Sequence, residues 1–320
     1  MKKVVVKILS VVVVMTVCIG CGGGGDRMRM TVEGSGNFSF DLRGSGIAIV
    51  DWGDGSDRTI RNLDEDRHFS KIYSGSGRHT ITITGNDIIG LSASNERLTG
   101  LDVRRNPKLM RLEVGGQFAH LDVSRNTALT SLDVYSNQLT NLDVSNNTAL
   151  TALFVGGSLL TSLDVSRNTA LAVLYVSNTQ LTSLDLRNNT ALTRLEASHN
   201  QLTNLDVSNS TVLRELRANS NQLTSLDVSR NTELIELDVS NNQLTSLNVS
   251  NNTALHRLIV RDNQLTTPAL NTLLQSLPQG HWNINRGHSS VSIGNNPGTS
   301  GVDIIYGSTR VIRGWQIFGY

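Results

Sequence analysis

One stretch decides the fold: Leu139-Thr-Asn-Leu-Asp-Val-Ser-Asn-Asn-Thr-Ala-Leu-Thr-Ala-Leu-Phe-Val-Gly-Gly-Ser-Leu159. Copies of this 21-residue unit follow one another along the chain, and each copy carries two triplets, mostly of the form L-x-V or L-x-A. One series of triplets starts at Leu101, Leu121, Leu142, Leu163, Leu184, Leu205, Leu226 and Leu247. The other series starts at Leu91, Leu112, Leu132, Leu153, Leu174, Leu195, Leu216, Leu237 and Leu258. Such a period predicts a solenoid, in which each repeat forms one coil and packs on its neighbours.

The length of the coil follows from strand geometry. A circuit of 10 or 11 extended residues has a perimeter of about 35 Å, at roughly 3.3 Å per residue. Two walls about 10 Å apart leave too little of that perimeter for two strands. A circuit of 21 residues leaves about four residues for each wall. The sequence therefore predicts coils of 21 residues with two short strands each, stacked into two parallel ladders and a nearly straight prism.

Each unit divides its residues between core and turns. The side chains expected to point inward in the unit above are Leu139, Leu142, Val144, Leu150, Leu153 and Val155. Each is worth roughly 1.5–3 kcal/mol when it is fully buried. Asparagines recur at two turn positions, where inward amides can satisfy backbone groups of adjacent coils. One series is Asn137, Asn200, Asn221, Asn242 and Asn263, and the other is Asn126, Asn147, Asn168, Asn189, Asn231 and Asn252.

The segment Leu129-Thr-Ser-Leu-Asp-Val-Tyr-Ser-Asn-Gln-Leu139 resembles the leucine-rich repeat. With L-T-x-L-D-V-S-x-N-T-A-L in the other half, the 21-residue form is most similar to the cysteine-ladder internalins. The resemblance covers residues 88–266 and implies protein binding or adhesion at a cell surface. This chain departs from it where those proteins place cysteine, since it has Val114, Val134, Val155, Val176, Ala197, Ala218, Val239 and Val260. We therefore expect that position to be small apolar core.

Composition narrows the class of protein. The chain of 320 residues is long enough for two domains, and its formal net charge of +1 argues against nucleic acid as a partner. Its two cysteines, Cys18 and Cys21, both lie near the N-terminus, so no disulfide is expected in the body of the fold.

Residues 1–21 have the form of an export signal. Lys2, Lys3 and Lys7 precede an apolar segment, residues 8–19, that is too short to span a membrane. Gly20 before Cys21 resembles the lipobox of bacterial lipoproteins, which implies lipidation of Cys21, with residues 22–26 as a glycine-rich tether. Gly22 stands in place of the Asp that commonly retains such lipoproteins at the inner membrane, so the resemblance implies an outer-membrane location. The alternative is an ordinary secretion signal that is cleaved nearby.

Residues 27–87 predict a small β-sandwich. Short alternating stretches at 37–42, 47–51, 68–73 and 78–84 are separated by Gly, Ser and Asp turns. The run Val50-Asp-Trp-Gly-Asp-Gly-Ser56, with the later strands, resembles the polycystic-kidney-disease (PKD) type of immunoglobulin-like domain. We expect Trp52 in the core and a tight turn at Gly53 and Gly55. Asp51, Asp54 and Asp57 are weak candidates for calcium ligands, and turn-capping is their alternative role.

Residues 267–320 are expected to form a C-terminal α+β cap over the exposed end of the solenoid. Leucines at helical spacing follow Pro268 and end at Pro278, which predicts a helix over 268–277. Short strands are predicted at 290–293, 302–306 and 315–318. The fold class is therefore mainly β: a leucine-rich-repeat solenoid with an N-terminal sandwich and this cap.

Catalytic motifs are not found in the sequence. The seven histidines show no metal-binding spacing, and no nucleophile, phosphate-loop or dinucleotide fingerprint occurs. We therefore predict a protein that is not an enzyme and that needs no cofactor. An acidic ladder, with neighbours about 4.8 Å apart, could bind cations or stay solvated. It consists of Asp102, Asp122, Asp143, Asp164, Asp185, Asp206 and Asp227, with Asn248 at its end.

Comparison of the repeats separates a uniform half from a variable half. The L-D-V-S-x-N-T-A-L half barely changes, whereas the other half varies at its outward positions. Apolar and aromatic residues gather there, followed by a mixed-charge strip, which favours recognition of a protein ligand or another cell-surface component. The candidate residues are Tyr135, Phe154, Val173, Tyr175, Arg194, Glu196, Glu215, Arg217, Glu236 and Asp238. Glycan capture and a structural spacer without a ligand are the alternatives.

Overall fold

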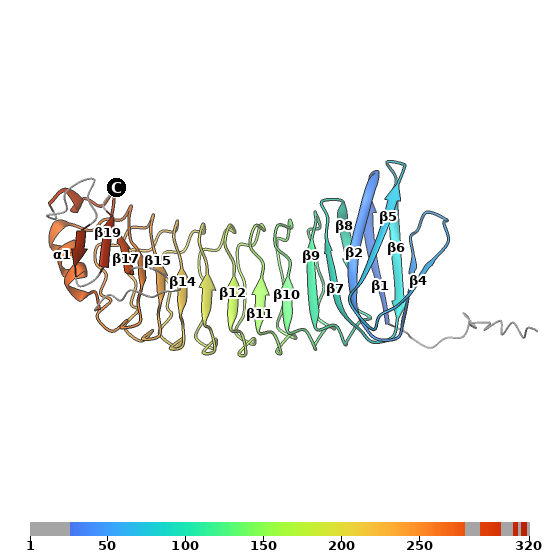
Figure 1. Ribbon diagram of the computed structural model, residues 1–320, viewed down its shortest axis with the longest axis horizontal. Coiled ribbons are helices and arrows are strands. Elements are labelled where there is room, and N and C mark those ends of the chain that lie inside the picture. Colours follow the sequence, from blue (N-terminus) through green and yellow to red (C-terminus); the bar gives the residue numbers. More distant parts are fainter. Residues whose placement is uncertain (1–25, 279–288, 302–309, 313–314, 319–320) are drawn as a thin grey trace, which may run out of the picture.

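The computed structural model describes residues 26–278, 289–301, 310–312 and 315–318. A 14-stranded sheet runs along the molecule, and a five-stranded sheet packs against its N-terminal end. Figure 1 shows a row of coils that begins at a β-sandwich and ends at the helix α1 (Thr267–Ser276). The predicted export signal and most of the predicted tether lie outside the described residues.

The coils stack through one parallel ladder. Its strands are β7 (Ile88–Ser94), β9 (Arg111–Gly115), β10 (Ser131–Asp133), β11 (Ala152–Phe154), β12 (Val173–Tyr175), β13 (Arg194–Glu196), β14 (Glu215–Arg217), β15 (Glu236–Asp238) and β16 (Arg257–Ile259). Equivalent residues pair across each step, such as Leu132 with Leu153 and Leu153 with Leu174. The central leucine of every strand from β9 to β16 is buried, because its side chain alternates inward between two outward neighbours. The register of 21 residues read from the sequence is confirmed, as is the entry of Leu91 into it, paired with Leu112.

The prediction of two strands per coil was wrong. In the uniform half of the coils, from residue 103 to residue 266, the backbone forms turns and no strand. The Asp143 carboxylate accepts the N–H of Ser145 at 2.9 Å, and the N–H groups of Asn147 and Leu150 bond to carbonyls three residues back. Such local bonds compete with a ladder because they use the groups that a ladder would pair. We call this half the turn wall, and the half with strands the strand wall.

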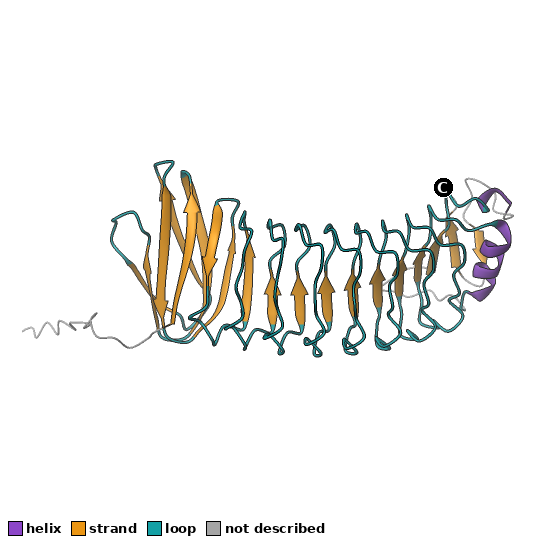
Figure 2. Ribbon diagram, turned by 180° about the vertical axis from the view of Figure 1, so that it is seen from behind, coloured by secondary structure: helices purple, strands orange, loops and turns teal. Residues whose placement is uncertain are grey.

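The shape follows from these two walls. Figure 2 shows the coils in a gently curved row, with loops on the side opposite to the strands. Among the described residues, the only α-helix is α1, at the C-terminal end of the row, so helices do not line the outer wall of the coils.

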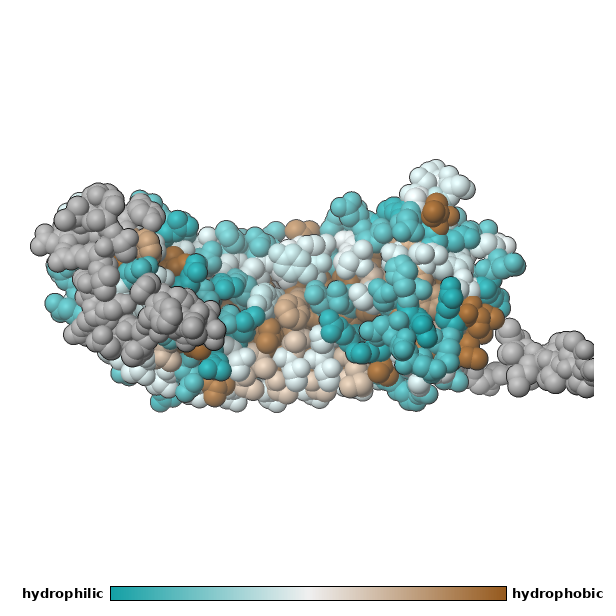
Figure 3. Space-filling model, in the orientation of Figure 1, coloured by the Kyte–Doolittle hydropathy of each residue, from teal (hydrophilic) through white to brown (hydrophobic). Residues whose placement is uncertain are grey.

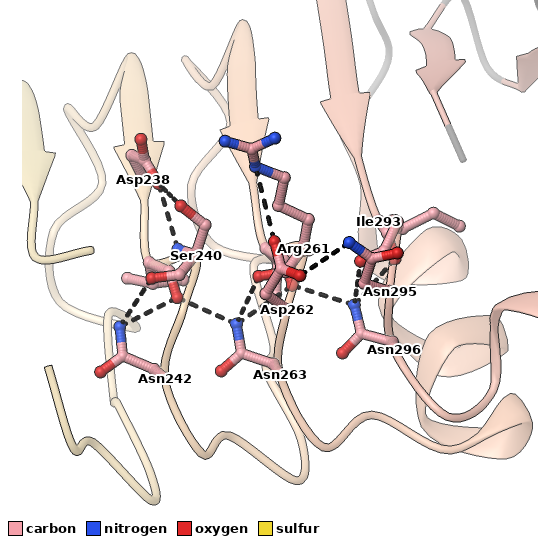
Figure 4. A network of polar contacts seen from close by, with 12 residues as sticks. Asp238, Ser240, Asn242, Arg261, Asp262, Asn263, Ile293, Asn295 and Asn296 are labelled. Atoms are coloured by element: carbon pink, nitrogen blue, oxygen red, sulfur yellow. Dashed lines mark hydrogen bonds and ion pairs between the residues drawn. The ribbon is translucent and has the colours of Figure 1, made fainter. Parts of the chain in front are cut away.

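The predicted role of the inward asparagines is confirmed. On the turn wall, Asn147 donates to the carbonyls of Val123 at 3.0 Å and Asn126 at 2.9 Å, both in the previous coil. On the strand wall, Asn263 donates to Val239 of the previous coil and to Val260 of its own coil. Figure 4 shows this second ladder near the C-terminal end, where one asparagine after another bridges two coils.

The N-terminal sandwich has more strands than the sequence predicted. The predicted ones appear as β2 (Gly36–Gly44), β3 (Ile47–Asp51), β5 (Arg67–Tyr73) and β6 (Arg78–Gly85). Two further strands, β1 (Asp26–Glu33) and β4 (Thr59–Asn62), were not predicted. Phe40 stacks on Phe69 and contacts Trp52 in the core. The Tyr73 hydroxyl donates to the Trp52 carbonyl at 2.8 Å. Gly53 and Gly55 have positive φ angles of 71° and 79°, as the predicted turn requires.

The sandwich and the solenoid share sheets. Strand β2 pairs with β7, and β1 pairs with β8 (Leu98–Asp102), so both layers of the sandwich continue into the first coil. The five-stranded sheet has the order β4-β3-β6-β1-β8. Apolar core therefore runs without a break from one region to the other, and the first coil is covered as a solenoid end must be.

The C-terminal segment contains a further coil that the sequence analysis did not recognise. After α1, strand β17 (Ser289–Ser292) pairs in parallel with β16, and Val291 lies beside Leu258. Asn296 donates to the carbonyls of Val260 and Ile293, which extends the asparagine ladder by one step. Strands β19 (Trp315–Phe318) and β18 (Arg310–Ile312) complete the sheet. The strand predicted at 302–306 lies outside the described residues.

Candidate functional site

The strand wall presents one continuous outward surface, because its strands pair at equivalent positions. Nine of the ten predicted binding residues lie at outward positions of β11–β15, and Tyr135 follows β10. None of the ten is buried. The structure therefore brings all of them to one side of the solenoid, over the six successive coils from β10 to β15.

Four of these residues form an aromatic patch, which we define as Tyr135, Phe154, Val173 and Tyr175. Phe154 and Tyr175 pair in adjacent strands, and their ring centroids lie 4.9 Å apart with a tilt of 36°. Both rings are half-buried, whereas Tyr135 is 44% exposed. Figure 3 shows apolar surface in the middle of the strand wall, with hydrophilic surface on both sides. A partly exposed aromatic cluster of this kind is typical of interaction sites.

A glycine makes room for the first ring of the patch. A Cβ atom on Gly156 would lie 2.6 Å from a ring carbon of Tyr135 and 2.6 Å from the Ser177 carbonyl oxygen. Most later coils have Ser or Asn at the equivalent position, such as Ser198 and Asn219. The absence of a side chain at Gly156 thus leaves space for the Tyr135 ring of the preceding coil, which packs there against the backbone.

Two neighbouring residues were missed by the sequence analysis. Leu159 is 47% exposed, in the same coil as Phe154, and occupies a position where most other coils have glutamine, such as Gln138 and Gln180. This departure from the repeat was the signal that could have identified it. Asp133 lies beside Phe154 in the ladder, at one of the variable outward positions.

Asp133 is an acidic group without a cationic partner among the described residues. Its Oδ1 accepts the N–H of Tyr135 at 3.1 Å. Burial raises the pKa of Asp133, and the neighbouring charge of Glu113 adds to this rise. The side chain therefore contributes an incompletely compensated negative charge at the N-terminal edge of the aromatic patch.

The charged strip continues the surface toward the C-terminus, and we define it as Arg194, Glu196, Glu215, Arg217, Glu236 and Asp238. Arg194 pairs with Glu215 at 2.6 Å and donates to the Tyr175 hydroxyl at 3.2 Å. Arg217 lies between two carboxylates, with Glu196 at 3.6 Å and Glu236 at 3.2 Å.

The charges of this strip largely neutralise one another. Glu236 also pairs with Arg257 at 3.3 Å, and Asp238 accepts the hydroxyl and the N–H of Ser240. Side-chain exposure is only 14% for Glu196 and 20% for Glu236, so these carboxylates are held within the surface. The strip is a preformed network rather than a row of free charges, which limits the cost of ordering it on binding.

The metal candidates do not converge on a common point. Asp54 pairs with Lys71 at 2.9 Å and accepts two hydrogen bonds from Ser56, which hold its pKa at about 2. Asp51 accepts the N–H of Gly53 and pairs with Arg58. No group of three or more His, Cys, Asp or Glu side chains in the described part of the chain could hold a metal ion. These contacts correspond to the turn-capping role of the aspartates.

The acidic ladder is also used for turns. Asp122, Asp143, Asp164, Asp206 and Asp227 each accept the N–H of the serine two residues later. Asp102 and Asp185 accept the corresponding N–H of Arg104 and Arg187. These bonds to serine or arginine lower the pKa values of the ladder carboxylates, which stay exposed or half-exposed.

Comparison with known proteins gives structural neighbours and no sequence family. The sequence matches no family model and no curated protein. The functional domain of InlJ from Listeria monocytogenes, which includes a cysteine ladder, is 28% identical, with a TM-score of 0.52 over 74% of this chain and 56% of that chain. An internalin, InlF, from the same species is 23% identical, with a TM-score of 0.41 over 65% and 74% of the two chains.

A leucine-rich-repeat protein from Leptospira interrogans is 19% identical, with a TM-score of 0.41 over 64% of this chain and 66% of that chain. The match to InlJ spans little more than half of the InlJ domain. The chain is thus a mainly β, leucine-rich-repeat solenoid whose structural neighbours include internalins. In the described residues, no helix has the length and apolar character needed to cross a membrane.

Proposed function

We propose that this protein is an exported, surface-exposed binding or adhesion protein that recognises a protein ligand through its strand wall and catalyses no reaction. The observation that carries the proposal is the aromatic patch, in which Phe154 and Tyr175 pair on adjacent strands of a largely polar solenoid surface. The similarity to InlJ supports a role in binding. Aromatic residues in the whole sequence amount to only 4%, so their concentration here is not a consequence of composition.

The contrast between the two walls supports this assignment of the binding face. On the turn wall, the same residues recur because each one holds a turn or a neighbouring coil. On the strand wall, the backbone ladder and the inward leucines hold every coil, and outward side chains add contacts only where charged residues happen to pair, as Arg194 does with Glu215. Such positions are free to diverge, and a diverged surface with apolar anchors is typical of recognition sites.

The patch and its borders define the chemistry of the ligand. Phe154 and Tyr175 offer an apolar platform for an aliphatic or aromatic side chain. Asp133 adds a negative charge at one edge, and Arg194 and Glu215 form an ion pair at the other. A protein segment with an apolar anchor next to a lysine or arginine complements this arrangement, because a paired cation would stabilise the Asp133 carboxylate.

The site of attachment completes the proposal. Lipidation at Cys21 would place the sandwich nearest to the membrane. The coils that form the strand wall would then lie farther from the anchor. We expect Cys21→Ala to release the protein from the membrane fraction or to leave it unprocessed. Unchanged fractionation without lipid on the mature N-terminus would contradict this part of the proposal.

The ligand class is tested by screening. The chain from residue 26 onward, labelled, is applied to arrays of surface proteins and of glycans, alongside the Phe154→Ala and Tyr175→Ala variants. We expect protein hits that both variants lose and that Asp164→Ala, on the turn wall, retains. Hits confined to glycans would replace the protein ligand by a sugar stacked on the tyrosines. Hits that no strand-wall variant affects, or an absence of hits, would favour a structural spacer.

A further inference from the structure

An arginine-rich pocket lies where the sandwich meets the turn wall. The aromatic patch lies on the other wall, the strand wall. The pocket has a volume of about 310 Å³. Its lining consists of Arg27, Arg29, Asp102, Arg104, Arg105 and Arg125. Five of these six side chains are cationic, although the whole chain has a formal net charge of only +1. The pocket therefore concentrates positive charge far beyond the average of the molecule.

Three structural elements bring these side chains together. Arg27 and Arg29 lie on strand β1 of the sandwich, and Arg29 pairs in register with Asp102 of β8. Arg105 and Arg125 occupy equivalent turn positions of two successive coils, 20 residues apart. The cluster thus depends on the junction between sandwich and solenoid, and neither region would form it alone.

The positive charge of the pocket is only partly compensated by the protein. Arg104 forms two hydrogen bonds with Asp102, both of 3.0 Å. Asp122 is the other acidic group near the cluster, and Arg104 and Arg125 contribute to the lowering of its pKa, after its hydrogen bonds to Ser124.

The remaining four arginines have no ion-pair partner within the part of the chain that the structure describes. These are Arg27, Arg29, Arg105 and Arg125. The Nε atom of Arg27 is also buried without a hydrogen-bond partner in that part of the chain. Arg27 itself is half-buried, and four unpaired cations held close together repel one another, so an anionic ligand would stabilise the cluster.

The chemistry of the side chains selects the type of anion. Guanidinium groups bind oxyanions in a planar, bidentate geometry, and several of them around one pocket suit a group with three terminal oxygens. A phosphate monoester carries about 1.5 to 2 negative charges near pH 7, more than a single carboxylate. We propose that this pocket binds the phosphate group of a phosphorylated ligand.

The surrounding surface distinguishes two possible sources of that phosphate. Along the outward face of the same sheet, Arg27 pairs with Thr84, Thr84 with Ile49, and Ile49 with Ile60. Ile60 is 62% exposed, and Ile47 nearby on β3 is 58% exposed. A lipid headgroup could bind the arginines while its membrane covers these isoleucines, whereas a soluble phosphorylated molecule would use the pocket alone.

The test uses the full chain, with two phosphate probes and a matched control. Calorimetry measures the binding of inorganic tripolyphosphate at low salt, and flotation measures binding to phosphatidic acid vesicles against phosphatidylcholine vesicles. Arg29→Gln with Arg105→Gln removes two exposed arginines from the pocket. The control, Arg167→Gln with Arg230→Gln, removes the same charge from the turn position that Arg125 occupies, in later coils.

We expect the pocket variant to weaken tripolyphosphate binding by about tenfold or more, which corresponds to the loss of one or two charged hydrogen bonds. The control variant should bind like the unmodified chain, and thermal unfolding should show that both variants are folded. Arg27→Gln with Arg125→Gln provides a second, independent pair.

The two probes distinguish the source of the phosphate. Vesicle binding that is lost with the pocket variant identifies a lipid headgroup, and tripolyphosphate binding alone identifies a soluble ligand. Equal weakening in the pocket and control variants, or no binding of either probe, would overturn the proposal.

Discussion

The strand wall and the turn wall surround the same core, and they differ in which atoms hold the coils together. On the strand wall, backbone groups pair from coil to coil, so the outward side chains can vary. On the turn wall, the side chains themselves make the bonds, as in the contacts of Asn147 with the previous coil and of Asp143 with its own turn. This difference explains why one half of the repeat is uniform and the other is not, before any ligand is considered.

The comparison also separates two asparagine ladders. On the strand wall, the ladder is interrupted at Ser158 and Thr179, whose hydroxyls donate to the carbonyls of Val155 and Val176 in their own coils. These are the coils that carry Phe154 and Tyr175. On the turn wall, only Ser210 replaces asparagine between Asn106 and Asn252, and it still donates to the previous coil, at the Asn189 carbonyl. The asparagine bridge to the preceding coil is therefore missing at these two positions, although the Thr179 hydroxyl also bonds to Asn200 Oδ1 in the next coil.

The largest effect is expected from breaking the turn wall. Asn168 is fully buried and donates to the carbonyls of Val144 at 3.1 Å and Asn147 at 2.9 Å. Asn168→Ala should lower the free energy of unfolding by about 1–3 kcal/mol, because two buried carbonyls each lose one of their two hydrogen bonds and the link between the coils is broken. Chemical denaturation measures the change. A variant as stable as the unmodified protein would show that the uniform half is not needed for stability.

A smaller effect of opposite sign is expected from repairing the strand-wall ladder. Ser158→Asn places an amide where most other coils have an asparagine that donates to a Val or Ala carbonyl of the preceding coil, and the carbonyl here is that of Val134. We expect the free energy of unfolding to rise by about 0.5–1.5 kcal/mol, the net value of one hydrogen bond. Thermal and chemical unfolding of the variant test this. A loss of stability would mean that the interruption is required by the packing of these coils.

The smallest effect concerns the acidic ladder and pH. Bonds to serine lower the folded-state pKa of Asp164 below that of the unfolded chain, so its contribution to stability is present above about pH 4 and is lost as the pH falls through the folded value. Asp164→Asn should be nearly neutral at pH 7, because Asn248 accepts the same turn N–H at 2.9 Å in the last coil of the ladder. As the pH is lowered, the free energy of unfolding of the variant should fall slightly less steeply than that of the unmodified protein. A clear loss of stability at pH 7 would show that the charge itself matters there.

Much of the fold could be predicted because the repeat is periodic. The register, the inward leucines and the asparagine bridges follow from a spacing that recurs in every coil. The prediction of a second ladder of strands was wrong, because local turn bonds to residues such as Asp143 form in its place. The length of the coil alone does not reveal that these bonds form. The missed strand β1 alternates Met28, Met30 and Val32 inward, so period-two alternation could have identified it.

The candidate site could be predicted only in outline. The positions of Phe154 and Tyr175 follow from the repeat, since equivalent residues of adjacent coils become neighbours. The network around Arg217 could not be derived, because it depends on which of several reachable carboxylates each arginine selects. The arginine pocket joins strand β1 to turns about 75 or more residues later, and no spacing in the sequence indicates that contact.

The central claim, that the strand wall is the binding face, is tested most directly by one affinity measurement. The dissociation constant of the partner found on the array is measured for the unmodified chain, Phe154→Ala, Tyr175→Ala and the turn-wall control Asp164→Ala. We predict that each aromatic variant loses about 1–3 kcal/mol of binding free energy while remaining folded, and that the control binds normally. Normal binding by both aromatic variants, or unfolding of the solenoid by either of them, would contradict the account.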